Sequence, residues 1–447
     1  MKRKVLLVGT GFQGICDAAQ LVGLPEIELH MIDAAPHFGG ILRSFQLNGF
    51  FVDRGLHLFS GTDTKMLAFL EEVLQGRLNF ISSTPSSGFS GVTTENYDLP
   101  DLSNLDKKIR SKILTELLSL SDTNIENASN LSQYLRNRYG LTAGKIFREI
   151  FQALYKINPD NLEANEISKT SLVRLKFGDD SQMMKLKLNP HLDSILAARR
   201  PLKSAAKEVS SYYPSGGKGM LEFALAAERW LSGFGVKIHL NQSVNTLQYS
   251  DNKWSAELSG SKHLFDQVIW SNGSVQQLAK ILGIGESDNE LSTSAATIFA
   301  IYGVRKADIC FNPYVQIFDP DEIVSRVGAA GVFGNQITEK DETFITCECP
   351  VAVSDIFWTN AEEYVEKIWN CLERYSLVSP GAHPQWSKIV KVPKTLTFHK
   401  VGSTELNLKL ADMLSTKYKS LYFRVNPLNS RRDIFRASFD TLEFAGQ

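Results

Sequence analysis

The sequence has little of what marks a membrane or secreted protein. No run of about 18 apolar residues occurs, so no transmembrane segment is expected. The basic start, Met1 to Lys4, precedes an apolar stretch that glycines interrupt, which argues against a signal peptide. The five cysteines are scattered, which predicts buried free thiols in a reducing, cytoplasmic compartment rather than disulfides.

Charge and metal-ligand patterns are equally sparse. The net charge is −1 over 447 residues, so no global field draws the chain to nucleic acid or anionic lipid. Cys347 and Cys349 would face one way on a strand, but no second pair completes a zinc site, and no metal is expected. The length and the 43% hydrophobic content predict a globular protein of two or three domains, with oligomerisation left open.

What the sequence does have is a glycine turn close to its start. Residues 4–8 predict a strand and residues 15–24 a helix, with Gly9, Gly11 and Gly14 between them. In a dinucleotide-binding unit the first glycine permits a tight turn and the second lets backbone approach a pyrophosphate. The third lets the helix pack on the strand. The backbone of Phe12 and Gln13 would add N–H groups for the phosphates at the start of the helix.

A second predicted strand, residues 27–32, ends at Asp33. An acid placed about 20 residues after the glycine turn can bind a ribose hydroxyl. The order of strand, turn, helix, strand and acid therefore predicts a dinucleotide site. The alternative interpretation is a glycine turn in another α/β unit, with Asp33 capping a helix.

Two short segments follow that could extend this site. The pair Gly39 and Gly40, with Arg43 beyond it, could admit the ribose and phosphates of a cofactor, although a plain turn would have the same composition. Further on, Arg54 and His57 stand beside Asp53 in the stretch GFFVDRGLHLF. Such a cluster is also found at ordinary strand ends.

Taken together, these motifs resemble the FAD-dependent amine oxidase and protoporphyrinogen oxidase superfamily, which includes UDP-galactopyranose mutase. The resemblance continues in residues 212–272, with Pro-Ser-Gly-Gly at 214–217, the strand GVKIHLN and the strand FDQVIWS. In the family a valine between these strands meets the adenine through its backbone, and here that residue is Val244. In the family a last strand ends in the pair Gly-Arg before the flavin. This chain has Phe423 at the position of that glycine and keeps the arginine as Arg424.

The resemblance implies an α/β fold in which a Rossmann-like FAD-binding domain carries an inserted α+β substrate domain. The FAD-binding domain would comprise residues 1–75, 205–288 and 411–447. The substrate domain, with its helical block, would comprise residues 76–204 and 289–410. Within these domains the pattern also predicts a helix over 64–80 and strands over 264–270 and 331–333.

The resemblance implies FAD as cofactor and a small-molecule substrate. The first hypothesis is an oxidoreductase of the amine oxidase type that oxidises a small or sugar-like substrate by hydride transfer to flavin. The second is a flavin-dependent nucleotide-sugar mutase of surface glycan synthesis, and the third a non-catalytic FAD-binding protein. His57 matches the family's histidine before the flavin face, and we expect Arg54, Arg199 and Arg431 to bind substrate.

Overall fold

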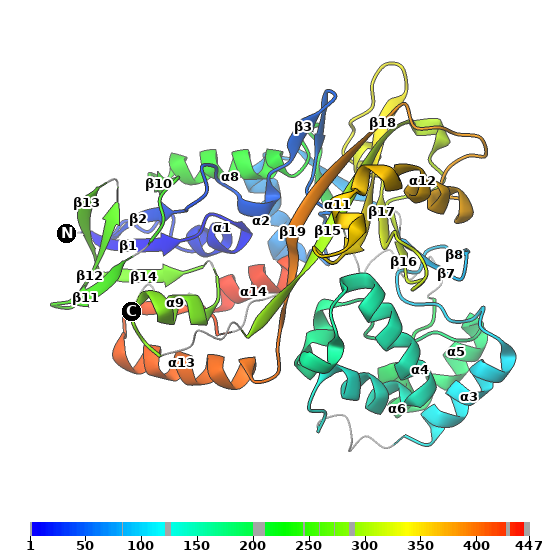
Figure 1. Ribbon diagram of the computed structural model, residues 1–447. Coiled ribbons are helices and arrows are strands. Elements are labelled where there is room, and N and C mark those ends of the chain that lie inside the picture. The colour runs from blue at the N-terminus through cyan, green and yellow to red at the C-terminus, as the bar shows by residue number, and fades with distance from the viewer. Residues whose placement is uncertain are drawn as a thin grey trace. The chain divides into compact units, whose positions relative to one another are not determined.

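The computed structural model describes residues 2–82, 84–120, 127–199, 211–244, 246–258, 260–271, 273–285, 291–425 and 430–441. The chain divides into two compact units (Figure 1). Unit 1 comprises Met1–Phe80, Val209–Glu290 and Thr404–Gln447, and unit 2 comprises Ile81–Glu208 and Leu291–Ser403. Each unit therefore combines segments that lie far apart in the sequence.

Unit 1 is built on a five-stranded sheet in which every pairing is parallel. Its order is β10 (Lys237–His239), β2 (Ile27–Ile32), β1 (Arg3–Val8), β14 (Gln267–Trp270) and β20 (Leu421–Phe423). Strand β1 lies in the centre, and its last four residues are buried, as expected for a parallel strand covered on both faces. The predicted Rossmann-like architecture is confirmed.

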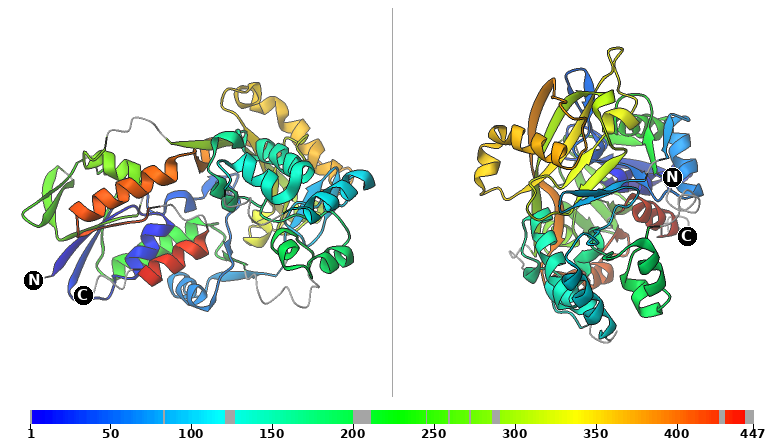
Figure 2. Two further views of the ribbon diagram at one scale, coloured as in Figure 1. Left: turned by 90° about the horizontal axis from the view of Figure 1, so that it is seen from below. Right: turned by 90° about the vertical axis from the view of Figure 1, so that its right-hand side faces the viewer.

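Helices cover one face of this sheet. Helix α1 (Phe12–Ala19) lies beside α14 (Arg431–Thr441), and α8 (Leu221–Gly233) packs against α1 (Figure 2). The opposite face carries α9 (Val275–Ile281), α13 (Ser403–Lys417) and an antiparallel sheet of β11 (Leu247–Ser250), β12 (Lys253–Leu258) and β13 (Ser261–Phe265). Alternation along β1 sends Leu6 and Val8 into this second core.

The smaller elements of unit 1 lie between β2 and β10 in the sequence. They are η1 (Gly40–Leu42), the hairpin β3 (Phe45–Leu47) and β4 (Phe50–Val52), the sheet β5 (Phe59–Ser60), β9 (Ser211–Pro214) and β6 (Leu78–Ile81), and α2 (Thr64–Leu74). The helix predicted over 64–80 ends early. Gln75 and Gly76 have positive φ, which terminates a helix, and β6 follows.

Unit 2 contains a seven-stranded sheet. Its order is β19 (Trp386–His399), β15 (Ser292–Arg305), β18 (Glu342–Val351), β17 (Arg326–Gly328), β16 (Tyr314–Ile317), β7 (Ser86–Phe89) and β8 (Val92–Thr94). One face packs on α12 (Val365–Arg374) around a core that includes Cys347 and Cys349. Both cysteines are free and buried as expected, and burial raises the pKa of each thiol, whereas Cys310 is exposed.

The predicted helical block is also in unit 2. It comprises α3 (Lys107–Leu118), α4 (Leu131–Tyr155), η3 (Pro159–Asn161), η4 (Ala164–Lys169), α5 (Asp180–Leu186) and α6 (Pro190–Ile195). Helix α4 contains one break, at Gly140, where φ is 79° and ψ is 179°. Tyr139, Phe147 and Phe151 are fully buried around it, so these aromatic side chains form the core of the block.

One strand prediction was wrong, and a second is confirmed except for a break in the middle. Residues 331–333 lie in a short helix, α10 (Ala330–Phe333), which packs so tightly on β18 that a Cβ at Gly331 would lie 2.3 Å from Thr343 Oγ1. Residues 264–270 form two strands, because Asp266 interrupts them and accepts a hydrogen bond from the backbone N–H of Lys4.

The remaining short elements are η5 (Lys306–Asp308), α11 (Ile356–Thr359) and η6 (Ala361–Tyr364), all in unit 2. Among the helices in the described ranges, none is long and apolar enough to cross a membrane.

Candidate cofactor site

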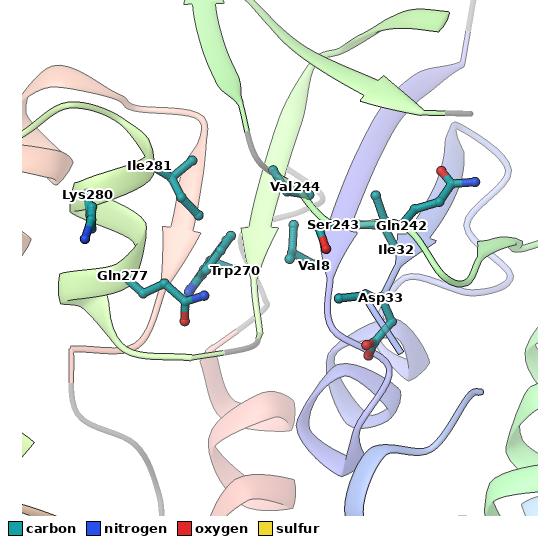
Figure 3. A pocket seen from close by; sticks show the side chains of 11 residues that line it. Val8, Ile32, Asp33, Gln242, Ser243, Val244, Trp270, Gln277, Lys280 and Ile281 are labelled. Carbon is teal, nitrogen blue, oxygen red and sulfur yellow. The ribbon is translucent and has the colours of Figure 1, made fainter. Parts of the chain in front are cut away.

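A cavity of about 490 Å³ opens at the carboxyl ends of the parallel strands of unit 1 (Figure 3). Its floor is a single row across the sheet, because Ile32 on β2, Val8 on β1 and Trp270 on β14 are register partners. Register partners point to the same face, so the three side chains form one apolar surface. The site therefore lies where ligands bind open α/β sheets.

Polar groups surround this floor. Gln242, Ser243 and Val244 follow β10 and line one side, and Gln277, Lys280 and Ile281 line another from α9. In Figure 3, Asp33 lies at one end of the row and the α9 side chains at the other. The structure thus brings together two predicted residues, Asp33 and Val244, that lie 211 positions apart in the sequence.

Asp33 is held by the turn that follows β1. Its carboxylate accepts hydrogen bonds from Thr10, through the backbone N–H at 2.8 Å and the hydroxyl at 2.7 Å, and from the N–H of Ala35 at 2.9 Å. No helix begins at Asp33, so the helix-cap alternative was wrong. The carboxylate instead ties the ends of β1 and β2 together beside the cavity.

The three glycines of the turn differ in what surrounds them. Gly9 has a φ of 111°, which a tight turn requires. A Cβ on Gly14 would lie 2.1 Å from the carbonyl oxygen of Gly9, so only glycine lets α1 approach β1 this closely. A Cβ on Gly11 would meet no atom within 4 Å, so the turn is open there, as a pyrophosphate would require. The Phe12 side chain packs on Phe59 and is buried, while Gln13 is partly exposed.

Gly39 and Gly40 lie against this turn. Gly39 donates its N–H to the carbonyl of Thr10 at 3.2 Å, and a Cβ on Gly40 would lie 3.2 Å from the Cα of Gly11. Both glycines have positive φ. Arg43 is partly buried, and its guanidinium donates to the carbonyl of Phe38 at 3.3 Å.

Asp53 is the buried centre of a second network. Its carboxylate accepts from the hydroxyls of Ser44 and Tyr213 and from the N–H of Met220, at 2.5, 2.6 and 3.0 Å. Burial raises the pKa of Asp53, although these three hydrogen bonds oppose the shift. The network joins the N-terminal motif segment, with Ser44 and Asp53, to the later motif segment, with Tyr213 and Met220. Asp53 is buried, whereas its neighbour Arg54 is exposed.

Arg431 comes from the last helix to the segment that contains His57. Its guanidinium donates to the carbonyl of Leu58 at 2.9 Å and lies 5.7 Å from the centre of the Phe59 ring. Burial lowers the pKa of Arg431 to about 10, against the opposing effect of the Asp53 carboxylate. A cation is thus held at the backbone of Leu58, which follows His57 in the sequence, and His57 is itself partly buried.

Two other arginines are engaged within the protein. Arg424 forms two hydrogen bonds, at 3.0 and 2.7 Å, with the buried carboxylate of Asp17 on α1, which also accepts from the hydroxyl of Ser438. In unit 2, Arg199 donates to the carboxylate of Asp180 at 3.1 Å. The structure therefore directs both guanidinium groups towards internal carboxylates, and their predicted ligand contacts stay predictions.

Sequence reasoning did not find most of the cavity wall. Trp270, Gln277 and Lys280 line it, but none of them was predicted to contact the cofactor. Trp270 falls within the strand FDQVIWS, where a strand residue is expected to be structural. The signal that could have found it is its position at the carboxyl end of a strand that neighbours β1.

Comparison with known proteins agrees with this architecture. The family model described as flavin containing amine oxidoreductase matches residues 14–271, more than half of the chain. The chain therefore belongs to the flavin-containing amine oxidoreductase family. None of the curated proteins gives a significant match to the sequence.

Three solved structures illustrate the shared fold. A protein assigned as protoporphyrinogen oxidase from Exiguobacterium sp. 255-15 is 14% identical, with a TM-score of 0.68 over 99% of this chain and 98% of that one. Reduced UDP-galactopyranose mutase is 14% identical, with a TM-score of 0.73 over 100% and 95%. Putrescine oxidase bound to putrescine is 13% identical, with a TM-score of 0.61 over 98% and 99%. At these identities the likeness concerns the fold alone.

Proposed function

We propose that this protein binds FAD and oxidises a small-molecule substrate by hydride transfer to the flavin, as an oxidoreductase of the amine oxidase type. The observation that carries the proposal is the cavity over the row of Ile32, Val8 and Trp270, with Asp33 at its edge, in a chain of a flavin-containing family. A cavity of about 490 Å³ is within the usual range for small-molecule sites.

The residues present fit the adenosine and pyrophosphate part of FAD. The open space at Gly11 and the N–H groups at the start of α1 would receive the pyrophosphate, with Gly39 and Gly40 beside them. Asp33 would accept hydrogen bonds from the ribose, and the backbone of Val244 would contact the adenine. The flavin, when bound, supplies the hydride acceptor, and the chain supplies binding and orientation.

The proposed reaction centre contains His57 and Arg431. A neutral imidazole at His57 would hold or move a proton next to the flavin. Arg431, fixed to the carbonyl of Leu58, would place positive charge beside it. Arg54, which is exposed, is a candidate for contact with substrate.

The oxidase is favoured over the mutase by the state of three basic residues that could otherwise hold the diphosphate of a nucleotide sugar. Lys187 pairs with Asp193 at 2.6 Å, Arg199 with Asp180, and Arg424 with Asp17. Each of these three positive charges thus already has a carboxylate partner. An amine substrate, of which the putrescine bound to putrescine oxidase is an example, needs no such clamp.

Cofactor content tests the proposal directly. The purified protein should be yellow, and heat should release a flavin that chromatography identifies as FAD rather than FMN. If the protein is isolated without flavin, FAD added to the apoprotein should restore the flavin absorbance and raise the melting temperature. A colourless protein that neither FAD nor FMN reconstitutes would contradict FAD binding, and a protein that retains FMN would contradict the role of the adenosine cavity.

A further inference from the structure

The apolar row beneath the cavity continues to the edge of the sheet and ends there in a histidine. His239 on β10 is the register partner of Ile32, which is itself the partner of Val8, so its side chain lies on the same face. His30 comes two residues before Ile32 on β2 and therefore also points to this face. The two imidazole rings stack with their planes 9° apart, and Nδ1 of His30 lies 3.1 Å from Nε2 of His239.

The direction of the hydrogen bond between the two rings follows from their surroundings. Nε2 of His30 lies 3.1 Å from a carboxylate oxygen of Glu28, and the hydrogen bond from Lys237 lowers the pKa of Glu28 to about 2. An ionised carboxylate only accepts, so Nε2 of His30 carries a proton. In the neutral ring Nδ1 of His30 is then a lone pair, to which Nε2 of His239 donates. A proton added at Nδ1 of His30 removes this acceptor.

The environment of the pair opposes its protonation. Burial lowers the pKa of His30 and of His239 below the usual 6.5, although the hydrogen bond to Glu28 opposes the shift in His30. The other charged or titratable groups that face the pair are Lys237 on β10, Lys4 on β1 and His263 on β13. As the pH falls below 6.5, protons therefore favour a state in which the two rings have separated.

The backbone beside this pair belongs to the candidate site. The carbonyl of His239 accepts a hydrogen bond from the N–H of Asp33 at 3.0 Å, and the carbonyl of Asp33 accepts one from the N–H of Gln242 at 2.9 Å. Strand β10 has only three residues, and both Asp33 and Gln242 line the cavity. A displacement of β10 from β2 would therefore move the acid and the cavity wall together.

We propose that His30 and His239 are positioning residues for the nucleotide: the hydrogen bond between their rings holds β10 against β2, and protonation of the pair releases this edge and weakens nucleotide binding. This inference rests on the proposed binding of FAD and adds a pH dependence to it. The imidazoles act through the backbone of Asp33 and Gln242, without contact with the ligand.

Affinity measured against pH tests the inference, with FAD and ADP-ribose as probes. ADP-ribose has the adenosine diphosphate of FAD without the flavin, and it lacks the terminal phosphate group that ionises near pH 6. Between about pH 7.5 and about pH 5 we expect the affinity of the wild type for both probes to fall about three- to tenfold. The reason is that released imidazoles take up protons near pH 6.5, whereas paired ones do not.

His239→Gln is the conservative variant. Its amide nitrogen can replace Nε2 as donor to His30, and its amide oxygen can accept from His30 once that ring is protonated. Its affinity at pH 7.5 should stay within about twofold of the wild type, and its affinity should not depend on pH. His239→Leu removes the donor and should lower affinity at pH 7.5 about three- to tenfold. His263→Gln, which removes a neighbouring histidine outside the pair, should keep the wild-type pH profile.

Hydrogen exchange of the apoprotein follows the edge without any ligand. The amides of Asp33 and Gln242 report on it directly, because their hydrogen bonds join the ends of β2 and β10. In the wild type their protection factors should fall between about pH 7.5 and about pH 5, and in His239→Gln they should not. Protection factors that do not change with pH in the wild type would contradict the release of the edge.

The outcomes separate this inference from the proposed function. If FAD binds with an affinity that is independent of pH, or rises as the pH falls, the proposed function stands and the inference fails. The same holds if the wild type and His239→Gln have equal pH profiles. If ADP-ribose shows the expected profile but the protein takes up no FAD, the inference stands and the proposed function fails. If neither probe binds the wild type, both are wrong.

Discussion

The carboxylate of Asp33 connects two elements that a ligand would have to meet together. It accepts two hydrogen bonds from Thr10, in the glycine turn, and one from Ala35, after β2. A carboxylate has about four acceptor positions, so one remains for a ribose hydroxyl. Asp33 thus has both a structural and a binding role, and substitutions can separate them.

We expect Asp33→Ala to weaken FAD binding by about 10- to 100-fold, because a hydrogen bond to a charged group contributes roughly 1.5–3 kcal/mol. Asp33→Asn should lose less, because its amide oxygen still accepts. Asp33→Glu should lose least, since glutamate is the other acid found at this position. Titration of FAD into each apoprotein measures the three affinities.

Thr10→Val is the matched control for this series. It removes the hydroxyl bond to Asp33 at 2.7 Å but leaves the backbone bond and the carboxylate in place. Its FAD affinity should change by less than about threefold. A loss as large as that of Asp33→Ala would mean that the acid acts only by holding the turn, and the ribose contact would then be wrong.

Gly11 and Gly14 allow a second comparison between binding and packing. A methyl group at Gly11 meets nothing within 4 Å, and the φ of −69° suits alanine. Gly11→Ala should therefore keep or slightly raise the stability of the apoprotein, by up to about 1 kcal/mol, while it weakens FAD binding. Gly14→Ala should instead lower stability by about 1–3 kcal/mol, because its Cβ overlaps the carbonyl of Gly9.

Chemical denaturation of the two apoproteins and FAD titration provide the measurements. Equal loss of stability in both variants would show that Gly11 is needed for the fold of the turn. An unchanged FAD affinity in Gly11→Ala would remove the pyrophosphate from this position.

At the scale of elements, the short edge strand β10 is notable because the cavity wall of Gln242 to Val244 follows it. It is held to β2 by polar contacts as well as by the sheet. Lys237 donates to Glu28 at 2.5 Å, and the imidazole rings of His30 and His239 stack with their facing nitrogens 3.1 Å apart. Stability of this edge therefore depends on charge.

The pH dependence of this edge has a defined sign. The hydrogen bond from Lys237, with a second from His30, lowers the pKa of Glu28 from 4.5 to about 2. A lowered carboxyl pKa contributes stability above pH 4.5 that is lost as the pH falls towards 2. Lys237 is half exposed, so we expect the contribution to be about 1 kcal/mol or less.

Glu28→Gln should therefore reduce the free energy of unfolding at pH 7 by up to about 1 kcal/mol and flatten its pH dependence between 4.5 and 2. Urea unfolding at several pH values measures both. In a double-mutant cycle, adding Lys237→Gln to Glu28→Gln should cost little more. Additive losses would indicate that the two side chains do not interact in solution.

At the scale of the whole molecule, the first two hypotheses differ in how the protein would use the flavin. An oxidase of the proposed type should be bleached by its substrate without oxygen and recover its colour when an electron acceptor is added. A panel of primary amines that includes putrescine, followed by absorbance near the flavin maximum, makes this measurement. We expect bleaching by at least one member of the panel.

UDP-galactopyranose serves as the comparison substrate. A mutase would act on it only after the flavin had been reduced by dithionite or NAD(P)H, and without net consumption of reductant. That result would replace the oxidase with the second hypothesis. A protein that binds FAD but shows neither reaction would favour the non-catalytic alternative.

The sequence by itself determined the first βαβ unit and the identity of the glycines and the acid in it. These residues lie within 30 positions of one another, and their pattern depends on local geometry: the hydrophobic period, the turn and the helix start. Local pattern gave the wrong prediction at residues 331–333. Three residues are too few to show a helical or strand period, and this segment forms a helix packed on β18.

Only the tertiary structure decided the wall of the cavity and the partners of the arginines. Trp270 meets Val8 because strands 262 residues apart in the chain pair side by side, and no local pattern encodes that pairing. The sequence predicts a cofactor contact for Arg424 but not its internal partner, which is Asp17 on the helix that follows the glycine turn. A charged side chain that becomes buried needs a partner of opposite charge. Which carboxylate becomes that partner depends on where the fold places both groups.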